Sequence, residues 1–131
     1  MSPSDPTVFS GVLVALGAIP GAWIRFWLVT VGGSRLSRRH WATWLVNMLA
    51  SFLLGVLVGL RPHWRQATRD SLDSALAIGF LGGLSTYSTL IAELVTAWRR
   101  QGRHEVLRLG VASLGGGLLA CLLGLTLART W

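Results

Sequence analysis

The sequence contains little charge, no lysine and only one cysteine. Charged residues make up 13% of its 131 residues, about half the share of a typical soluble domain, which argues against a soluble globular protein. The lone Cys121 excludes an intramolecular disulfide and a cysteine-based zinc site. The histidines, His40, His63 and His104, have no paired nucleophile or metal-ligand spacing around them, so no enzyme is expected.

Hydrophobic residues make up 52% of the chain and gather in segments of membrane-spanning length. A spanning helix needs about 20 mostly apolar residues, and four windows qualify: Val8–Val31, Trp41–Leu60, Ser74–Trp98 and Val106–Leu127. Tryptophans at or near the span ends are typical of an aromatic belt; they are Trp41, Trp44, Trp64, Trp98 and Trp131. The start of the chain lacks the basic residues of a signal peptide, so the first segment is expected to remain as a span. We predict one all-α membrane domain, residues 1–131, whose short loops favour antiparallel neighbours.

The twelve basic residues are all arginines, and against five acids they give a formal charge of +7. Most lie between the apolar segments, where arginines anchor loops at lipid headgroups, so membrane lipid rather than nucleic acid is the expected partner. The face with the termini carries Arg61, Arg65, Arg69 and Arg129; the other carries Arg35, Arg38, Arg39, Arg99, Arg100 and Arg103, or also Arg108. Because this bias sets orientation and is small here, we hypothesise insertion in both directions and an antiparallel dimer.

Small residues recur at four-residue spacing on three of the predicted helices. The rows are Gly17 and Gly21; Ser51, Gly55 and Gly59; and Ser113 and Gly117. Such rows let two helices approach closely in a membrane, and they indicate a packed bundle.

The third apolar segment weakens its own helix. Two adjacent glycines, Gly82 and Gly83, are followed by four hydroxyl side chains in five residues: Ser85, Thr86, Ser88 and Thr89. Free backbone groups inside a membrane are tolerated only where protein or a water-filled path receives them. The pattern predicts a third helix that is broken mid-membrane and holds an ion, as in transport proteins. A packed polar turn without an ion is the alternative.

Three further polar residues lie inside apolar segments, and each has two readings. Arg25 either snorkels to the membrane boundary or provides a fixed positive charge that attracts an anion. Asn47 either forms interhelical hydrogen bonds or offers its amide donors to an anion. Glu93 is either a proton-coupled carboxylate or a hydrogen-bonding residue near the interface.

Motifs in three of the four spans resemble the Fluc (CrcB-type) fluoride channels of bacteria. The first span of that family reads approximately Gly-x-x-x-Gly-Ala-x-x-Arg, as residues 17–25 do. The second reads Thr-x-x-Val-Asn followed by Gly-Ser-Phe-x-x-Gly, and residues 43–47 and 50–55 match it with Ala50 in place of the first glycine. The third reads Gly-Phe-x-Gly-Gly-x-Thr-Thr-Phe-Ser-Thr-Phe with a later Glu, as in residues 79–90 with Glu93.

The resemblance implies an antiparallel dual-topology dimer with two fluoride pores, formed with a second copy or a homologous chain. It also implies a structural sodium ion at the dimer centre, held by backbone carbonyls of Gly82 and Ser85 from each copy. Asn47 matches the family's pore asparagine, Arg25 its vestibule arginine and Glu93 its glutamate near the pore. Two family phenylalanines, whose ring edges face fluoride, are replaced by Tyr87 and Leu90. Of a polar track in the last span only Ser113 is kept, because Leu109 and Gly117 occupy the other two positions.

We therefore predict a passive fluoride channel of the bacterial inner membrane. Its expected pore residues are Asn47, Tyr87, Ser88, Thr89, Leu90 and Ser113, with Arg25 providing the electrostatic field. The alternatives are a small dual-topology exporter of organic cations and a non-conducting membrane subunit. The exporter needs an acid facing a central pocket, typically in the first span, where this chain has Arg25 instead.

Overall fold

The computed structural model describes residues 6–32, 39–63 and 70–130, and the regular structure in these ranges is helical. In chain order the elements are α1 (Pro6–Trp27), the π-helix η1 (Leu28–Gly32), α3 (Arg39–Leu60), the 3₁₀-helix η2 (Arg61–His63), the π-helix η3 (Asp73–Leu81), α5 (Gly82–Leu84), α6 (Tyr87–Gln101) and α7 (Arg103–Arg129). Helical structure also includes residues 70–72, directly before η3.

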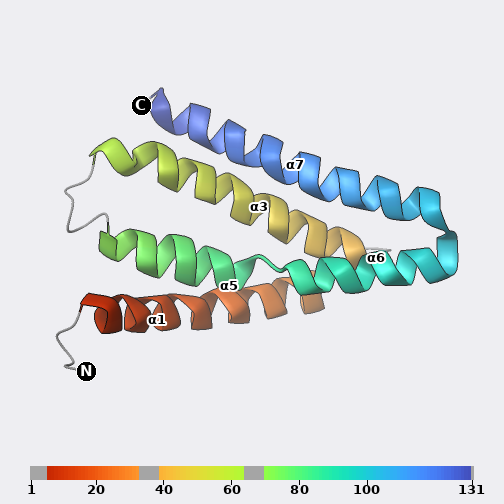
Figure 1. Cartoon of the computed structure of the whole chain (residues 1–131), viewed down its shortest axis with the longest axis horizontal. Coiled ribbons are helices and arrows are strands. Elements are labelled where there is room, and N and C mark those ends of the chain that lie inside the picture. Colours follow the sequence, from red (N-terminus) through yellow and green to blue (C-terminus); the bar gives the residue numbers. More distant parts are fainter. Residues whose placement is uncertain (1–5, 33–38, 64–69, 131) are drawn as a thin grey trace.

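Four helical stretches are long and apolar enough to cross a membrane, which confirms the predicted number. They are Val8–Val31, Trp41–Leu60, Asp70–Gln101 and Arg103–Arg129. The first two have the bounds expected from sequence, and the last two extend beyond them at both ends. The first and third stretches run in one direction, and the second and fourth run in the opposite direction (Figure 1). The start of α1 and the end of α7 therefore lie at the same end of the bundle.

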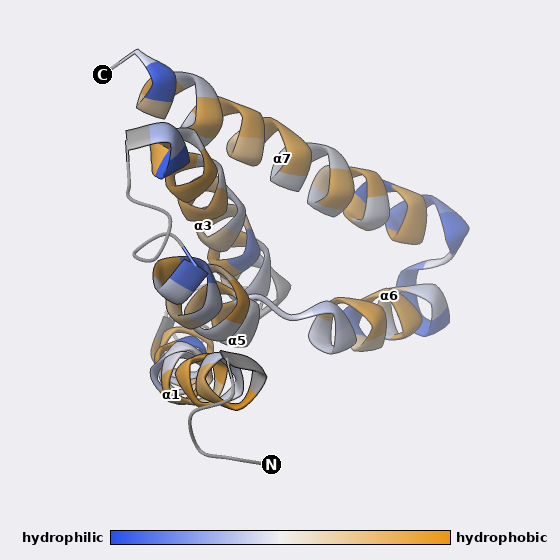
Figure 2. Ribbon diagram, turned by 60° about the vertical axis from the view of Figure 1, so that its left-hand side comes forward, coloured by the Kyte–Doolittle hydropathy of each residue, from blue (hydrophilic) through white to orange (hydrophobic). Residues whose placement is uncertain are grey.

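The closest neighbours are alternate spans rather than consecutive ones. α1 packs along η3 and α5, and α3 packs along α7, so each close pair is parallel (Figures 1 and 2). The short loops do reverse the chain between consecutive spans, as expected. Those consecutive spans are nevertheless not the ones that share the main helix–helix interfaces.

Glycines explain why these two pairs form. A Cβ on Gly17 or Gly21 would collide with a carbonyl oxygen of the third span, that of Ala75 or Phe80 respectively. In the other pair, a Cβ on Gly55 would collide with the Cys121 carbonyl. The predicted rows of small residues therefore mark true close approaches. Backbone contact of this kind is how helices associate in lipid, where apolar burial supplies no driving force between them.

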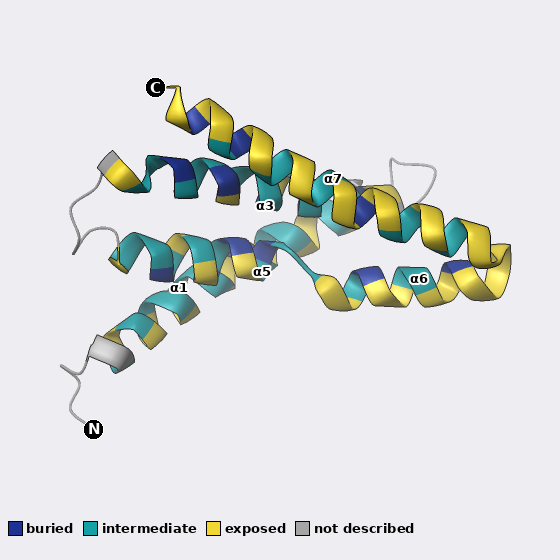
Figure 3. Cartoon of the chain, turned by 45° about the horizontal axis from the view of Figure 1, so that its top comes forward, coloured by how far each residue is buried: buried dark blue, intermediate teal, exposed yellow. Residues whose placement is uncertain are grey.

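The chain buries few residues of its own. Its core cluster consists of Val46, Ala50, Leu81 and Leu84, at the level of the α5–α6 junction, and most large apolar residues of α7 are exposed (Figure 3). Outward apolar side chains are expected where lipid or another chain replaces water as the surrounding medium. The small core thus coincides with the most irregular part of the third span.

Candidate functional site

The third span leaves helical geometry at Ser85 and Thr86, which join α5 to α6 in extended conformation. The glycines that suggested weakness, Gly82 and Gly83, are themselves helical. Packing accounts for this, because a Cβ on Gly83 would lie only 2.6 Å from the Ala18 carbonyl oxygen of α1. Gly83 therefore allows close contact with α1, and the chain leaves the helix one residue later, after Leu84.

Asn47 of α3 replaces the backbone hydrogen bond that this interruption removes from the Thr86 N–H. Its Oδ1 accepts from the Thr86 N–H at 3.0 Å, and its Nδ2 donates to the Thr86 carbonyl at 3.2 Å. In a continuous helix that N–H would instead bond the Gly82 carbonyl, four residues earlier. An unpaired backbone group in an apolar interior costs about 1–3 kcal/mol. Within the chain, Asn47 therefore forms interhelical hydrogen bonds, which is the first of its two predicted roles. Its Nδ2 carries a second hydrogen that the bond to Thr86 does not use.

Thr86 also begins α6 with its side chain. Its hydroxyl accepts a 3.4 Å hydrogen bond from the Thr89 N–H, as an N-cap residue does. The same hydroxyl lies 3.1 Å from Ser88 Oγ and 3.2 Å from Thr89 Oγ1. The hydroxyls of Thr86, Ser88 and Thr89 therefore form one cluster at the start of α6, and Asn47 bonds the backbone of Thr86 within it.

Arg25 of α1 contacts Ser85, the residue directly before this hydroxyl cluster. Its Nη1 donates to the Ser85 carbonyl at 3.3 Å, and the contact is partly buried. A cavity of about 310 Å³ lies beside it, lined by Arg25, Phe26, Val29, Thr30, Thr43, Thr86, Ser88 and Thr89. Arg25 and five residues with hydroxyl side chains therefore border one space, and these are side chains of the kind that supply an anion with positive charge and hydrogen-bond donors.

Four residues that line this cavity were not singled out by the sequence analysis: Phe26, Val29, Thr30 and Thr43. Of these, Thr43 is the buried one. The residue is only 1% exposed, and its Oγ1 has no hydrogen-bond partner within the described residues. A buried polar atom without a partner calls for an explanation, such as strain, a bound water or ion, or a functional role. The available signal was its spacing: Thr43 precedes Asn47 by four residues, so the two share a helix face.

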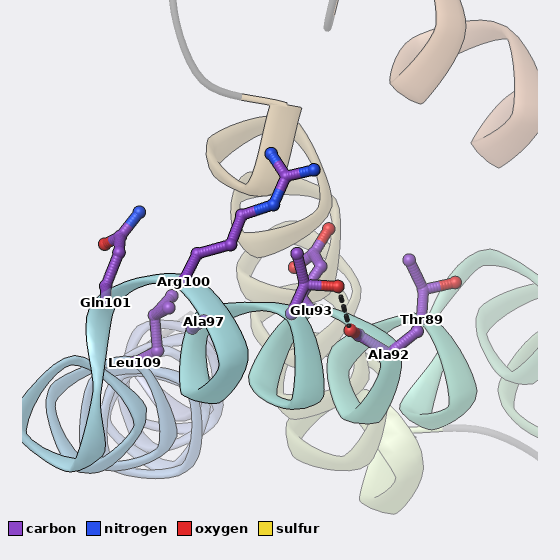
Figure 4. Close-up of a pocket in the computed structure, with 8 residues that line it drawn as sticks. Thr89, Ala92, Glu93, Ala97, Arg100, Gln101 and Leu109 are labelled. Atoms are coloured by element: carbon purple, nitrogen blue, oxygen red, sulfur yellow. Dashed lines mark hydrogen bonds between the residues drawn. The ribbon is translucent and has the colours of Figure 1, made fainter.

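Glu93 lies in a second, larger space along α6. This groove of about 490 Å³ is lined by Thr89, Ala92, Glu93, Thr96, Ala97, Arg100, Gln101 and Leu109. Figure 4 shows Thr89, Glu93 and Arg100 along one side of the helix. Thr89 lines both spaces. The Arg25 cavity and the α6 groove that contains Glu93 therefore share this residue.

The remaining predicted pore residues lie apart from the Arg25 cavity. Tyr87 is 70% exposed, whereas Leu90, three residues later on α6, is 8% exposed. Ser113 of α7 is buried, lines neither space, and its Oγ lacks a hydrogen-bond partner within the described residues. Tyr87 and Leu90 occupy the two positions expected to carry phenylalanine in Fluc-type channels. Within one chain, the first of these positions is exposed and the second is buried.

The carbonyls expected to hold sodium, those of Gly82 and Ser85, keep acceptor capacity in this chain. No group of three or more His, Cys, Asp or Glu that could bind a metal occurs in the described ranges. Gly82 is exposed, with open space where a side chain would be, and Thr86 N–H bonds Asn47 instead of continuing the helix. Ser85 O accepts from Arg25 but keeps a second lone pair.

Comparison with known proteins identifies the family of this chain. Residues 12–125 match the family described as CrcB-like protein, Camphor Resistance (CrcB). A fluoride-specific ion channel FluC 1 from Prochlorococcus marinus (strain MIT 9313) is 41% identical over 118 residues, or 89% of this chain and 90% of the relative. A fluoride-specific ion channel FluC from Chelativorans sp. (strain BNC1) is 34% identical, covering 91% and 95%. One from Bordetella avium (strain 197N) is 37% identical, covering 88% and 90%. The chain therefore belongs to the CrcB-like family.

Proposed function

We propose that this protein is a passive fluoride channel of a bacterial inner membrane, and not an enzyme. The names of its relatives support fluoride as the ion. The observation that carries the proposal is the Arg25 cavity, which is bordered by Arg25 and five residues with hydroxyl side chains beside an interrupted helix.

The energetics require such a group of donors. Moving a small anion into a medium of low dielectric constant costs on the order of 20 kcal/mol in the idealised limit. One hydrogen bond to a charged group returns about 1.5–3 kcal/mol, so a single residue is insufficient. Several hydroxyl donors and the field of Arg25 together are of the right order, and the second Nδ2 hydrogen of Asn47 adds a further donor.

The route we propose passes from the Arg25 cavity to the groove that contains Glu93. Thr89 lines both spaces and would transfer the anion between them. Ser88 would serve the first space, and Ser113 would donate after a small rearrangement. Tyr87 and Leu90 would line the route at the contact with a second copy, where the exposed Tyr87 ring has a partner to meet.

We further propose that two copies insert in opposite directions and meet at the interruption of the third span, so that one dimer has two pores. The near balance of arginines on the two faces supports this arrangement. The exposed surface at Gly82 also supports it, because open space there allows a second chain to approach. Gly82 and Ser85 carbonyls from both copies would hold sodium, which when bound supplies positive charge between the two chains.

The test is fluoride efflux from liposomes that contain the purified protein, with chloride efflux as the comparison. Rapid fluoride loss without chloride loss is expected. Absence of fluoride flux in a correctly folded preparation would overturn the proposal and favour a non-conducting subunit.

Thr43→Val provides the sharpest variant, because valine has nearly the same shape but no hydroxyl. Since Thr43 Oγ1 has no described hydrogen-bond partner, the variant is expected to be at least as stable as the unmodified protein. Its fluoride flux is nevertheless expected to fall by at least about tenfold, because one hydrogen bond to a charged group contributes about 1.5–3 kcal/mol. Thr126→Val is the matched control: its hydroxyl bonds the Leu123 carbonyl of its own helix, so flux is expected to be unchanged.

Two measurements address the dimer and the sodium separately from conduction. Reporter fusions at the C-terminus are expected to show both orientations in the membrane, and a single orientation would contradict dual topology. Replacing sodium with a large organic cation is expected to lower the melting temperature of the detergent-solubilised protein. An unchanged melting temperature would contradict the sodium assignment.

A further inference from the structure

A separate pocket of about 240 Å³ lies between the first turns of α3 and α7, away from the Arg25 cavity. It is lined by Trp41, Trp44, Glu105, Arg108, Leu109 and Ala112. The spans that supply it begin at Trp41 and Arg103, so the pocket is at the end of two spans, where the apolar interior of a membrane gives way to headgroups. It shares only Leu109 with the α6 groove.

The aromatic wall of this pocket is held in a defined geometry. The rings of Trp41 and Trp44 meet edge to face, with centroids 5.6 Å apart and planes at 76°. Trp44 Nε1 donates to the Ala112 carbonyl of α7 at 3.2 Å, which fixes the indole across the gap between the two helices. Indoles at this depth provide an apolar body beside a polar edge, and their faces attract cations.

The charged wall carries one group of each sign. Arg108 Nη1 lies 3.6 Å from Glu105 Oε2, whereas a charge-assisted hydrogen bond between such groups is about 2.7–2.9 Å long. The Glu105 side chain is 18% exposed and that of Arg108 is 71% exposed. The pair is thus close enough to keep the pocket neutral and too far apart for either group to saturate the other's hydrogen-bonding capacity.

We infer that this pocket binds the headgroup of a zwitterionic phospholipid with a primary ammonium, of the phosphoethanolamine type. The ammonium would donate to Glu105 against the tryptophan faces, and the phosphate would accept from the outward guanidinium of Arg108. Bidentate recognition of phosphate is a preferred role of arginine. The acyl chains would lie along the exposed apolar surface of α7, which includes Leu107, Val111 and Leu114.

The charged side chains of the pocket favour a phosphoethanolamine headgroup over phosphoglycerol and phosphocholine headgroups. An anionic phosphoglycerol headgroup offers Arg108 a phosphate but gives the Glu105 carboxylate no cation. A phosphocholine headgroup offers a cation whose nitrogen has no hydrogen to donate. Only the ammonium-bearing zwitterion satisfies both charged side chains, and this inference is independent of whether the protein conducts fluoride.

Native mass spectrometry of the detergent-solubilised protein, titrated with each of the three phospholipids, tests the assignment. Phosphatidylethanolamine is expected to be retained about tenfold better than phosphatidylglycerol or phosphatidylcholine, the equivalent of one charged hydrogen bond. Glu105→Gln is expected to abolish that preference. Asp73→Asn is the matched control, because Asp73 is also paired with an arginine, Arg61 at 2.9 Å, but lies outside this pocket; it should leave the preference intact.

A second variant keeps the test independent of the charged residues. Ala112→Leu fills the pocket without removing a charge, and it is expected to lower phosphatidylethanolamine retention to the level of the other lipids. Equal retention of the three lipids by the unmodified protein would overturn the inference. The same conclusion would follow if Asp73→Asn lost the preference as fully as Glu105→Gln, or if Ala112→Leu kept it.

Discussion

Replacing Asn47 with aspartate changes one hydrogen-bonding group at the contact between α3 and the interruption of the third span. The Oδ1 that accepts from Thr86 N–H at 3.0 Å is kept. The Nδ2 that donates to the Thr86 carbonyl at 3.2 Å becomes an oxygen, so two acceptors then face each other. The variant therefore tests the donor half of the contact while preserving size and the acceptor half.

The expected effect follows from what Thr86 loses. One neutral hydrogen bond contributes about 1 kcal/mol net, and the Thr86 carbonyl keeps the bond that it accepts as the N-cap of α6. A loss of about 1 kcal/mol corresponds to roughly a fivefold shift in the equilibrium between the held and released interruption, and the contact between two acceptors adds to it. A protonated carboxyl has one O–H donor and can replace the amide. The loss of stability is therefore expected at neutral pH and should diminish as the pH is lowered.

Thermal unfolding in detergent over a range of pH measures this directly, together with fluoride efflux at neutral pH. We expect a lower melting temperature for Asn47→Asp at pH 7, a smaller difference from the unmodified protein in acid, and strongly reduced flux. Ser51→Ala, one turn further along the same helix, is the control and should have little effect on either. An Asn47→Asp protein that melted and conducted normally would refute the view that this amide holds the interruption.

Three further predictions concern the same region. Thr86→Ala removes the N-cap of α6 and is expected to lower stability by about 1 kcal/mol, measured by chemical or thermal unfolding; no change would show that the hydroxyl cluster does not cap the helix. Gly21→Val is expected to prevent folding or sharply lower the melting temperature, because its Cβ would collide with the Phe80 carbonyl, whereas Gly11→Ala, with open space at its Cβ, should be tolerated. Leu90→Phe restores the aromatic residue of the resembling family in a buried position; if the missing ring limits conduction, fluoride efflux should increase, and unchanged or lower flux would exclude that explanation.

Much of the architecture could be predicted from periodicity and composition. Four apolar stretches required four helices, and the rows at Gly17 and Gly55 marked close helix contacts because only glycine permits backbone to touch backbone. The pairing of alternate spans was not predictable in this way. Loop length constrains chain direction, but which helices share an interface depends on matching surfaces from distant parts of the chain.

The candidate site shows the same division. Arg25, Asn47 and the hydroxyls of the third span could be identified from sequence, because polar groups inside an apolar segment must be satisfied or used. Two other features could not be identified from sequence. Asn47 bonds both backbone groups of Thr86, and Thr43 is buried without a hydrogen-bond partner among the described residues. Each is a relation between residues on different helices.

The linear order of residues by itself determined that the chain has four helices long and apolar enough to span a membrane, and where they lie. These properties depend on the free energy of placing each residue in an apolar medium, which is local to the chain. Only the tertiary structure decided that the helix is interrupted after its glycines rather than at them, and that arginine, amide and hydroxyls converge there. Those outcomes depend on packing against α1 and α3, because a backbone group released from one helix is stable only where another helix supplies its partner.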